Sequence, residues 1–384
     1  MTLTAVATHL ATLQSTIVIS AGYGVVAQAD GSYVAGVSEG TFNFPATAVG
    51  TWYRSTNNGT SWSQIGTSSG FNALTAAFPT NIQSNIICIG AESPATQIAR
   101  IQRSTNFGNT WTDVFSVGPS PTPPSRIPFI AGVQSFNLTK AIAWGQLDGL
   151  RSNPAMLYGI STDAGASFTA HSTFDAGDGF DLANACGIAD DSTIYLQYTK
   201  RGGVNRTSNF ARSDDGGSTW TTLGTPPGGT GTPTNTGNAV CCFTKEAIAL
   251  GGQIGTNPVS SIPALWWSDD AGASLHLLSS SDVANWPSGS FSTRTDEIKR
   301  LTRDAAILAI DRQAGGGGSP WRISLDQGHT YPIDVTLNVG SWQPFQSPTG
   351  KIVVTRTGRI LAPLKQSPDG TDWTHSIYGI DIVC

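Results

Sequence analysis

An eight-residue pattern recurs along this chain of 384 residues and limits the folds that the chain can adopt. The pattern reads Ser-x-Asp/Asn-x-Gly-x-Ser/Thr-aromatic, and copies begin at Ser55, Ser104, Ser161, Ser213, Ser268 and Ser324, the fifth with Leu275 in the aromatic position. A seventh copy, from Ser367 to Trp373, is one residue shorter. Successive copies start 49, 57, 52, 55, 56 and 43 residues apart. Such spacing indicates a repeat architecture in which each repeat is one supersecondary unit.

Each position of this pattern, which we call the turn motif, suits a tight turn between two β-strands. The third position supplies a side-chain oxygen that accepts backbone N–H groups of the turn. It is occupied by Asn57, Asn106, Asp163, Asp215, Asp270, Asp326 and Asp369. The glycine adopts a positive φ that other residues resist, and the aromatic ring packs on the flanking strands. We therefore expect a self-satisfied hairpin with a structural role rather than a calcium or substrate site.

The turn motif resembles the Asp-box, or BNR repeat, of sialidases, two-propeller xyloglucanases, sortilin-type receptors and a photosystem assembly factor. The resemblance implies an all-β chain folded as a seven-bladed β-propeller. Its blades would be four-stranded and antiparallel, with the box between the third and fourth strands, away from the active face. A period of about 55 residues leaves room for one such blade. We expect the propeller to span residues 16–384, and residues 1–15 to form a short helix, an extra strand or a docking arm.

The turn motifs also place the expected strands. In the first blade these are 16–20, 32–37, 50–55 and 61–65. The second blade has 71–77, 86–90, 98–104 and 110–115, and the third has 129–136, 140–145, 156–161 and 167–171. For the last blade we expect residues 351–355 to be the second strand. Many of these segments are short, apolar and β-branched, as buried strands are.

Charge and hydropathy exclude several classes of partner. The net charge of −5 argues against nucleic acid, because phosphate binding needs a basic surface. No run of 18 apolar residues occurs, so no helix is expected to insert into a membrane. No Lys or Arg precedes the apolar stretch near the start, so no Sec signal is expected. We expect a protein that is made in the cytoplasm and either stays soluble or is released by lysis, as virions are.

Cysteine and histidine usage predicts neither a metal site nor a cofactor. The five cysteines lack CxxC spacing, and the five histidines lack the spacing of metal ligands. We expect buried free thiols. Because side chains alternate along a strand, Cys241 and Cys242 should point to opposite faces.

Candidate binding residues fall in the loops opposite the turn motifs, where propellers usually carry their function. These residues are Arg126, Asp148, Arg151, Asp178, Arg201, Arg206, Trp286 and Arg312. Arginine suits bidentate recognition of carboxylates or phosphates, and tryptophan can stack on sugar rings. Asp175 and Asp181 share the region. The alternative is that these residues only decorate solvated loops.

On balance the sequence favours a non-enzymatic module over an enzyme. The favoured hypothesis is a virion appendage, of a phage tail or head, that recognises a host surface glycan or another virion protein. The alternative is a glycoside hydrolase that uses top-face carboxylates such as Asp148 and Asp178. A sialidase is disfavoured, because Arg126 in Ser-Arg-Ile-Pro lies between the second and third motifs instead of before the first. None of the four glutamates stands in a recognisable nucleophile context.

Overall fold

The computed structural model describes residues 4–15, 23–28, 30–39, 49–69, 76–79, 87–93, 98–118, 129–146, 156–172, 180–190, 192–202, 205–227, 237–254, 262–279, 281–284, 294–311, 321–338, 345–347, 352–367 and 374–383. Every regular secondary-structure element in these ranges is a β-strand. The chain divides into two compact units. Unit 1 contains Met1–Ala7, Phe174–Pro348 and Asp381–Cys384, and unit 2 contains Thr8–Thr173 and Thr349–Ile380.

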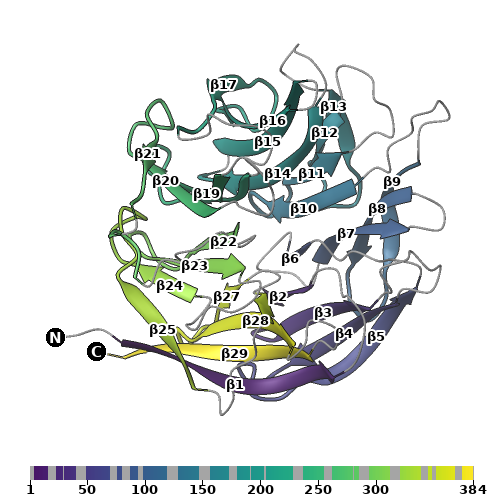
Figure 1. Cartoon of the computed structure of the whole chain (residues 1–384). Helices are drawn as coiled ribbons and strands as arrows, with labels where there is room; N and C mark the ends of the chain where they lie inside the picture. Colours follow the sequence, from purple (N-terminus) through teal and green to yellow (C-terminus); the bar gives the residue numbers. More distant parts are fainter. Residues whose placement is uncertain are drawn as a thin grey trace. The chain divides into compact units, whose positions relative to one another are not determined.

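Unit 2 contains three antiparallel sheets, each made of four consecutive strands (Figure 1). The first sheet is β2 (Tyr23–Ala27), β3 (Tyr33–Glu39), β4 (Val49–Ser55) and β5 (Ser63–Ser69). The second is β6 (Ala76–Pro79), β7 (Ile87–Ser93), β8 (Ile98–Ser104) and β9 (Thr112–Val117). The third is β10 (Phe129–Ser135), β11 (Ala141–Gln146), β12 (Met156–Ser161) and β13 (Thr169–Ser172).

Unit 1 repeats this arrangement. One sheet is β14 (Phe180–Ile188), β15 (Ile194–Gly202), β16 (Asn205–Ser213) and β17 (Thr221–Gly224). The next is β18 (Gly237–Cys242), β19 (Ile248–Ile254), β20 (Ile262–Ser268) and β21 (His276–Leu277). The strands β22 (Arg294–Arg300), β23 (Ala306–Asp311), β24 (Trp321–Ser324) and β25 (Ile333–Asn338) follow in the same order, and β26 (Phe345–Ser347) is a further short strand.

Strands from both chain ends lie together in one sheet. β1 (Thr4–Ser15) is next to β29 (Thr374–Val383) in the hydrogen-bonded order, and both strands have residues in each unit. β28 (Ile360–Ser367) follows β29, and β27 (Val353–Val354) pairs with β28. Figure 1 shows β1 running alongside β29. Residues 4–15 are therefore a strand, which was one of the three forms expected for the N-terminal segment.

The shortened seventh turn motif does not occupy the position that we expected. It connects β28 to β29, which are the second and third strands in the order β27-β28-β29-β1, not the third and fourth. The expectation that residues 351–355 form a second strand is also wrong, because β27, which lies in this segment, is the first strand in that order. The fourth place is taken by β1, from the other end of the chain, so no turn joins the third strand to it. Asp369 itself lies outside the described residues.

The other expected strands agree with the structure to within a few residues where it describes them. Residues 98–104 and 156–161 are strands with the predicted limits. The segment 16–20 lies outside the described ranges, and the first strand of that sheet is β2. The errors are at strand ends, which depend on pairing with neighbours rather than on local sequence.

The alternating order of strands gives each four-stranded sheet two distinct ends. The six turn motifs from Ser55 to Ser324 connect the third strand to the fourth. Because the strands are antiparallel, the turn from the first to the second strand lies at the same end, which we call the motif end. Connections from the second to the third strand, and from one sheet to the next, begin at the opposite end, the loop end.

Apolar side chains pack neighbouring sheets of unit 1 against one another. Ala185, Tyr195 and Phe210 of one sheet form a cluster with Val240, Cys242 and Ile248 of the next. A second cluster joins Ala239, Cys241 and Leu265 to Ile298 and Leu308. Alternation along β18 thus sends its two adjacent cysteines into different clusters, as expected. Both are buried free thiols, as are Cys88 and Cys186.

Candidate functional site

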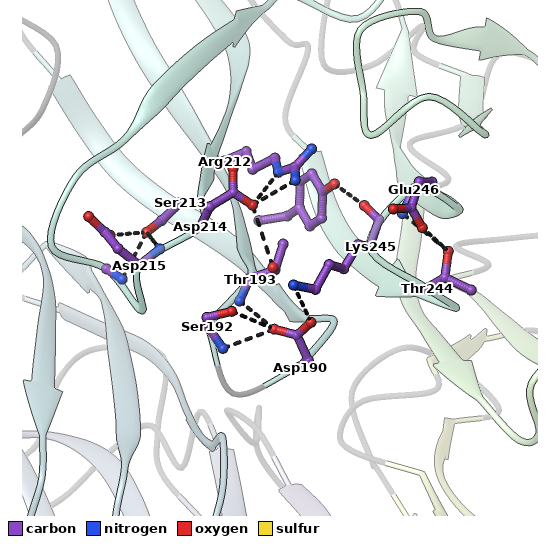
Figure 2. Close-up of polar contacts among 12 residues, drawn as sticks. Asp190, Ser192, Thr193, Arg212, Ser213, Asp214, Asp215, Thr244, Lys245 and Glu246 are labelled. Atoms are coloured by element: carbon purple, nitrogen blue, oxygen red, sulfur yellow. Dashed lines mark hydrogen bonds and ion pairs between the residues drawn. The ribbon is translucent and has the colours of Figure 1, made fainter.

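The turn motif at Ser213 uses its polar side chains within its own turn (Figure 2). The Ser213 hydroxyl donates to Oδ1 of Asp215 and accepts the backbone N–H of Gly217, each at 2.8 Å. Asp215 also accepts the backbone N–H of Thr219 at 2.8 Å and the Thr219 hydroxyl at 2.6 Å. The Thr219 hydrogen bonds lower the pKa of the Asp215 carboxyl to about 2. This carboxylate is therefore ionised and committed to holding the turn.

The same serine and Asp or Asn contacts recur in all six described copies of the motif. In each, the serine oxygen lies 2.8–3.0 Å from the glycine N–H. The third-position oxygen accepts the N–H of the Ser or Thr at 2.8–3.0 Å. The residues involved are Asn57, Asn106, Asp163, Asp215, Asp270 and Asp326. Two of the six are amides, so the contact does not need a negative charge. These oxygens act inside the turn, which leaves the loop end as the candidate location for chemistry.

A second set of charged residues at the motif end of unit 1 also serves structure. Asp190, in the turn before β15, accepts the N–H groups of Ser192 and Thr193 at 2.9 and 2.8 Å. Lys245 of the neighbouring sheet lies 3.0 Å from the same carboxylate, and its backbone carbonyl accepts the hydroxyl of Tyr195 (Figure 2). Burial alone would raise the pKa of the Asp190 carboxyl, but these hydrogen bonds lower the pKa by a larger amount, so the net shift is downward. The network joins two adjacent first-to-second-strand turns.

A β-bulge stands at a fixed position in the first strands of unit 1. In β22, four regular pairs run from Arg300↔Ala306 to Glu297↔Ala309. The next pair is Thr295↔Ile310, so Asp296 is an extra residue without a partner in the ladder. In β18 and β14 four regular pairs likewise precede the extra residues, which are Asn238 and Asn184. The bulge therefore falls at the same height above the motif end in three sheets.

These three extra residues form one row, because β14 contacts β18 and β18 contacts β22. β14 has a second bulge nearer its loop end, where Asp181 is the extra residue. Bulges often re-aim side chains beside active sites. On β10 of unit 2 the corresponding extra residue is Ala131. We call Asp181, Asn184, Asn238 and Asp296 the bulge row. It brings two carboxyl-bearing and two amide-bearing residues onto three adjacent strands.

Close packing fixes the backbone around Asp296. Thr295 is fully buried, and Glu297 is 7% exposed. A Cβ on Gly251 of β19 would lie 2.3 Å from Cγ2 of Thr295, a distance that real Cβ atoms do not show. Glycine at 251 therefore allows β22 to approach β19 as closely as it does. This contact positions the bulge that carries Asp296.

A basic hairpin stands at the loop end of the sheet β14–β17. β15 and β16 pair without interruption from Ile194↔Ser213 to Gly202↔Asn205. Arg201 and Arg206 are direct partners in this register, so two of the arginines proposed from the sequence are brought together. Lys200 is the partner of Phe180, the residue before Asp181. The hairpin is thus adjacent in the sheet to the start of the bulge row.

The remaining candidates proposed from the sequence cannot be placed. Arg126, Asp148, Arg151, Asp178, Trp286 and Arg312 all lie outside the described residues. Within the described ranges, no group of three His, Cys, Asp or Glu side chains is arranged to hold a metal ion. No helix in those ranges is long and apolar enough to cross a membrane.

Sequence reasoning missed most of the bulge row. Asp181 was noted only as one of several loop aspartates, and Asn184, Asn238 and Asp296 were not singled out. A bulge arises from a mismatch in pairing between two strands, and the residues around Asn238 and Asp296 follow no shared pattern. A register of both strands would have been needed to find them.

Comparison with solved structures identifies the architecture. The β-propeller domain of the trilobed protease of Pyrococcus furiosus matches with a TM-score of 0.51 and 8% identity, over 93% of this chain and 94% of that one. The α-L-arabinanase of Penicillium chrysogenum, solved with arabinobiose, matches with a TM-score of 0.50 and 12% identity, over 96% of this chain and 98% of that one. The fold is that of the β-propellers. No protein-family model and no curated protein matches the chain.

A GH74 enzyme of Niastella koreensis also matches, with 16% identity and a TM-score of 0.48, over 92% of this chain. This chain spans 64% of that enzyme's length. The arabinanase match is to a carbohydrate-active enzyme, and it contradicts our expectation of a non-enzymatic binding or virion module. That expectation rested on composition. A Gly-, Ser- and Thr-rich composition reflects short strands and turns, and it carries no information about the chemistry of a site.

Proposed function

We propose that the protein is a carbohydrate-active enzyme that cleaves glycosidic bonds in a polysaccharide. The observation that carries the proposal is the bulge row, in which Asp181, Asn184, Asn238 and Asp296 stand on three adjacent first strands. The arabinanase match, over 96% of this chain, supports the same class of substrate. We assign the reacting carboxyl groups to Asp181 and Asp296. They replace Asp148 and Asp178, the pair considered from the sequence.

The residue types of the row suit glycoside cleavage. In the usual mechanism, one carboxylic acid donates a proton to the leaving glycosidic oxygen, and a second carboxylate attacks the sugar or activates a water molecule. Asp181 on β14 and Asp296 on β22 stand on the two sides of β18, which carries Asn238. An amide group both donates and accepts hydrogen bonds, so Asn184 and Asn238 are of a residue type that suits the binding of sugar hydroxyl groups.

Two finer features of the architecture belong to the same proposal. We take β27, β28, β29 and β1 as a seventh blade that is completed by the N-terminal strand. We also take the six turn motifs as Asp-boxes, which stabilise the turns at the end opposite the site. A polysaccharide is then the partner of the loop end, and no nucleic acid is involved.

The test is release of reducing ends from a panel of polysaccharides, including arabinan, xyloglucan and pectin. Wild-type protein is expected to act on at least one of them. Loss of a general acid or base usually costs about 10²–10⁴-fold in rate, so D181N and D296N should each lose activity on that scale. D215N is the matched control, because Asn57 and Asn106 show that the turn accepts an amide. D148A and D178A test the earlier pair. Full activity in D181N and D296N contradicts the assignment, and no release from any glycan contradicts the function.

A further inference from the structure

The described pairing within the β15–β16 hairpin continues further than its described pairing with β14 and β17. β14 pairs with β15 as far as Phe180↔Lys200. On the other side, the pairing of β17 with β16 ends at Phe210↔Gly224. The pair Arg201↔Arg206 therefore lies past the last described pair on each side, at the loop end of the sheet.

This register makes two positively charged residues direct partners in the ladder. Residues that are direct partners in an antiparallel pair have Cβ atoms about 4.5–5.5 Å apart, and like charges there are destabilising. Residues 196–210 contain three Lys or Arg and no Asp or Glu, so the hairpin has no acidic residue of its own to offset them. The concentration is unusual in a chain with a net charge of −5. A bound anion would relieve the repulsion.

Arginine pairs are well suited to one kind of anion. The guanidinium group presents a planar fork of donors that matches the two oxygens of a carboxylate or a sulfate, and such charge-assisted pairs are stronger than neutral hydrogen bonds. Lys200 adds a third cation on β15, beside the strand that carries Asp181. A polysaccharide chain that reaches the bulge row is thus placed beside this hairpin.

We propose that the hairpin binds the acidic group of an anionic polysaccharide, a uronate carboxylate or a sulfate ester, through Arg201 and Arg206. The position of that group next to the cleaved bond rests on the proposed function. The binding itself does not, because it needs no reaction. The substrate class of the enzyme is accordingly an acidic polysaccharide rather than a neutral one.

The experiment measures binding and cleavage separately with matched glycans. Affinity electrophoresis compares polygalacturonate with its methyl ester, and a sulfated galactan with its desulfated form, so that each pair differs only in charge. Wild-type protein should be retarded by at least one charged member and not by its neutral partner. Loss of two charge-assisted contacts should weaken the apparent affinity of R201Q/R206Q by about 10–100-fold. R201K/R206K keeps the two positive charges but lacks the planar guanidinium groups, so its affinity should lie between those of the wild type and R201Q/R206Q.

R303Q is the matched control, because Arg303 is exposed in a turn at the motif end. It should bind as the wild type does. Equal retardation by charged and neutral glycans overturns the proposal, and so does retention of the charge preference in a folded R201Q/R206Q protein. Preference for a single-stranded oligonucleotide over every glycan also overturns it. Cleavage of a neutral glycan without charge preference refutes this inference and leaves the enzyme proposal intact. Charge-selective binding without any cleavage supports this inference and refutes the enzyme proposal.

Discussion

Asn238 and Asp296 occupy equivalent positions in adjacent sheets. Counted from the motif end, each is the extra residue next to four regular pairs of its first strand. The pairs below them fix the height of both residues above the motif end. The packing of Ala239 and Cys241 with Ile298 then fixes one sheet against the other. The pairing and packing of the sheets therefore fix the positions of Asn238 and Asp296 in the bulge row. Changes in that packing should move these residues.

The contact of Gly251 with Thr295 provides the first test of this coupling. In G251A the new methyl group would stand 2.3 Å from Cγ2 of Thr295, so β22 must move. Overpacking of this kind costs about 1–3 kcal/mol, and the melting temperature should fall accordingly. Activity should fall as well, because the shift moves the bulge at Asp296. The double variant G251A/T295S lacks that Cγ2 and should recover part of both losses. No recovery would show that the contact with Cγ2 is not the cause, because Cβ of residue 295 remains 2.8 Å from the new methyl group.

A second prediction concerns the glycine of the turn motif. Gly272 has a φ of +84°, and a Cβ there would lie 2.8 Å from Leu223 and 2.9 Å from Phe210 of the preceding sheet. Gly224 has a φ of +99°, and a Cβ added at Gly224 would have no atom within 4 Å. G224A should therefore cost only the left-handed strain of about 1–2 kcal/mol. G272A should cost about 1–3 kcal/mol more, because it also overpacks the interface. Equal melting temperatures for the two variants would contradict this role as a spacer between sheets.

The acid stability of the protein should depend on the motif aspartates. Hydrogen bonds from Ser167 and Thr219 lower the pKa values of Asp163 and Asp215 to about 2. The unfolded value is about 3.9, so the stabilisation is fully present above that pH and is lost as the pH falls toward 2. D163N/D215N should thus lose less stability than the wild type between pH 5 and pH 2, which denaturant unfolding at each pH measures. Parallel curves of unfolding free energy against pH for the two proteins would exclude this contribution of Asp163 and Asp215.

The buried thiols should be inert in the native protein. Burial raises the pKa values of Cys88 and Cys241 to about 12, and the pKa of Cys242 is also raised by burial. Thiolate is the reactive form, so almost none is present near neutral pH. In a C384S background, a thiol reagent should label no cysteine until denaturant is added. Rapid labelling of the folded protein would show that these cores open readily.

The turn motif was readable from the sequence because its hydrogen bonds are local. Ser213, Asp215 and Gly217 lie within five residues, and the chemistry of each residue type states its part in the turn. The four-stranded repeat followed from the spacing of the motifs. The error at Ser367 arose because the motif shows a turn but not which strands it joins, and pairing of β1 with β29 is a contact between the chain ends.

The site was less predictable for the same physical reason. Arg201 and Arg206 were selected by residue type, but their direct pairing depends on the length of the hairpin. The position of Asp296 depends on a pairing mismatch between β22 and β23 and on a glycine in another sheet. Such non-local relationships leave no pattern in a single sequence.

The rates of glycan cleavage by D296N and D215N decide whether the bulge row is the active site. Both variants exchange one carboxylate for an amide, one in the bulge row and one in a turn motif that is built to accept an amide. We expect kcat/KM of D296N to fall by about 10²–10⁴-fold while D215N keeps the wild-type value. Equal activity in the two folded variants would contradict the assignment of the bulge row as the active site.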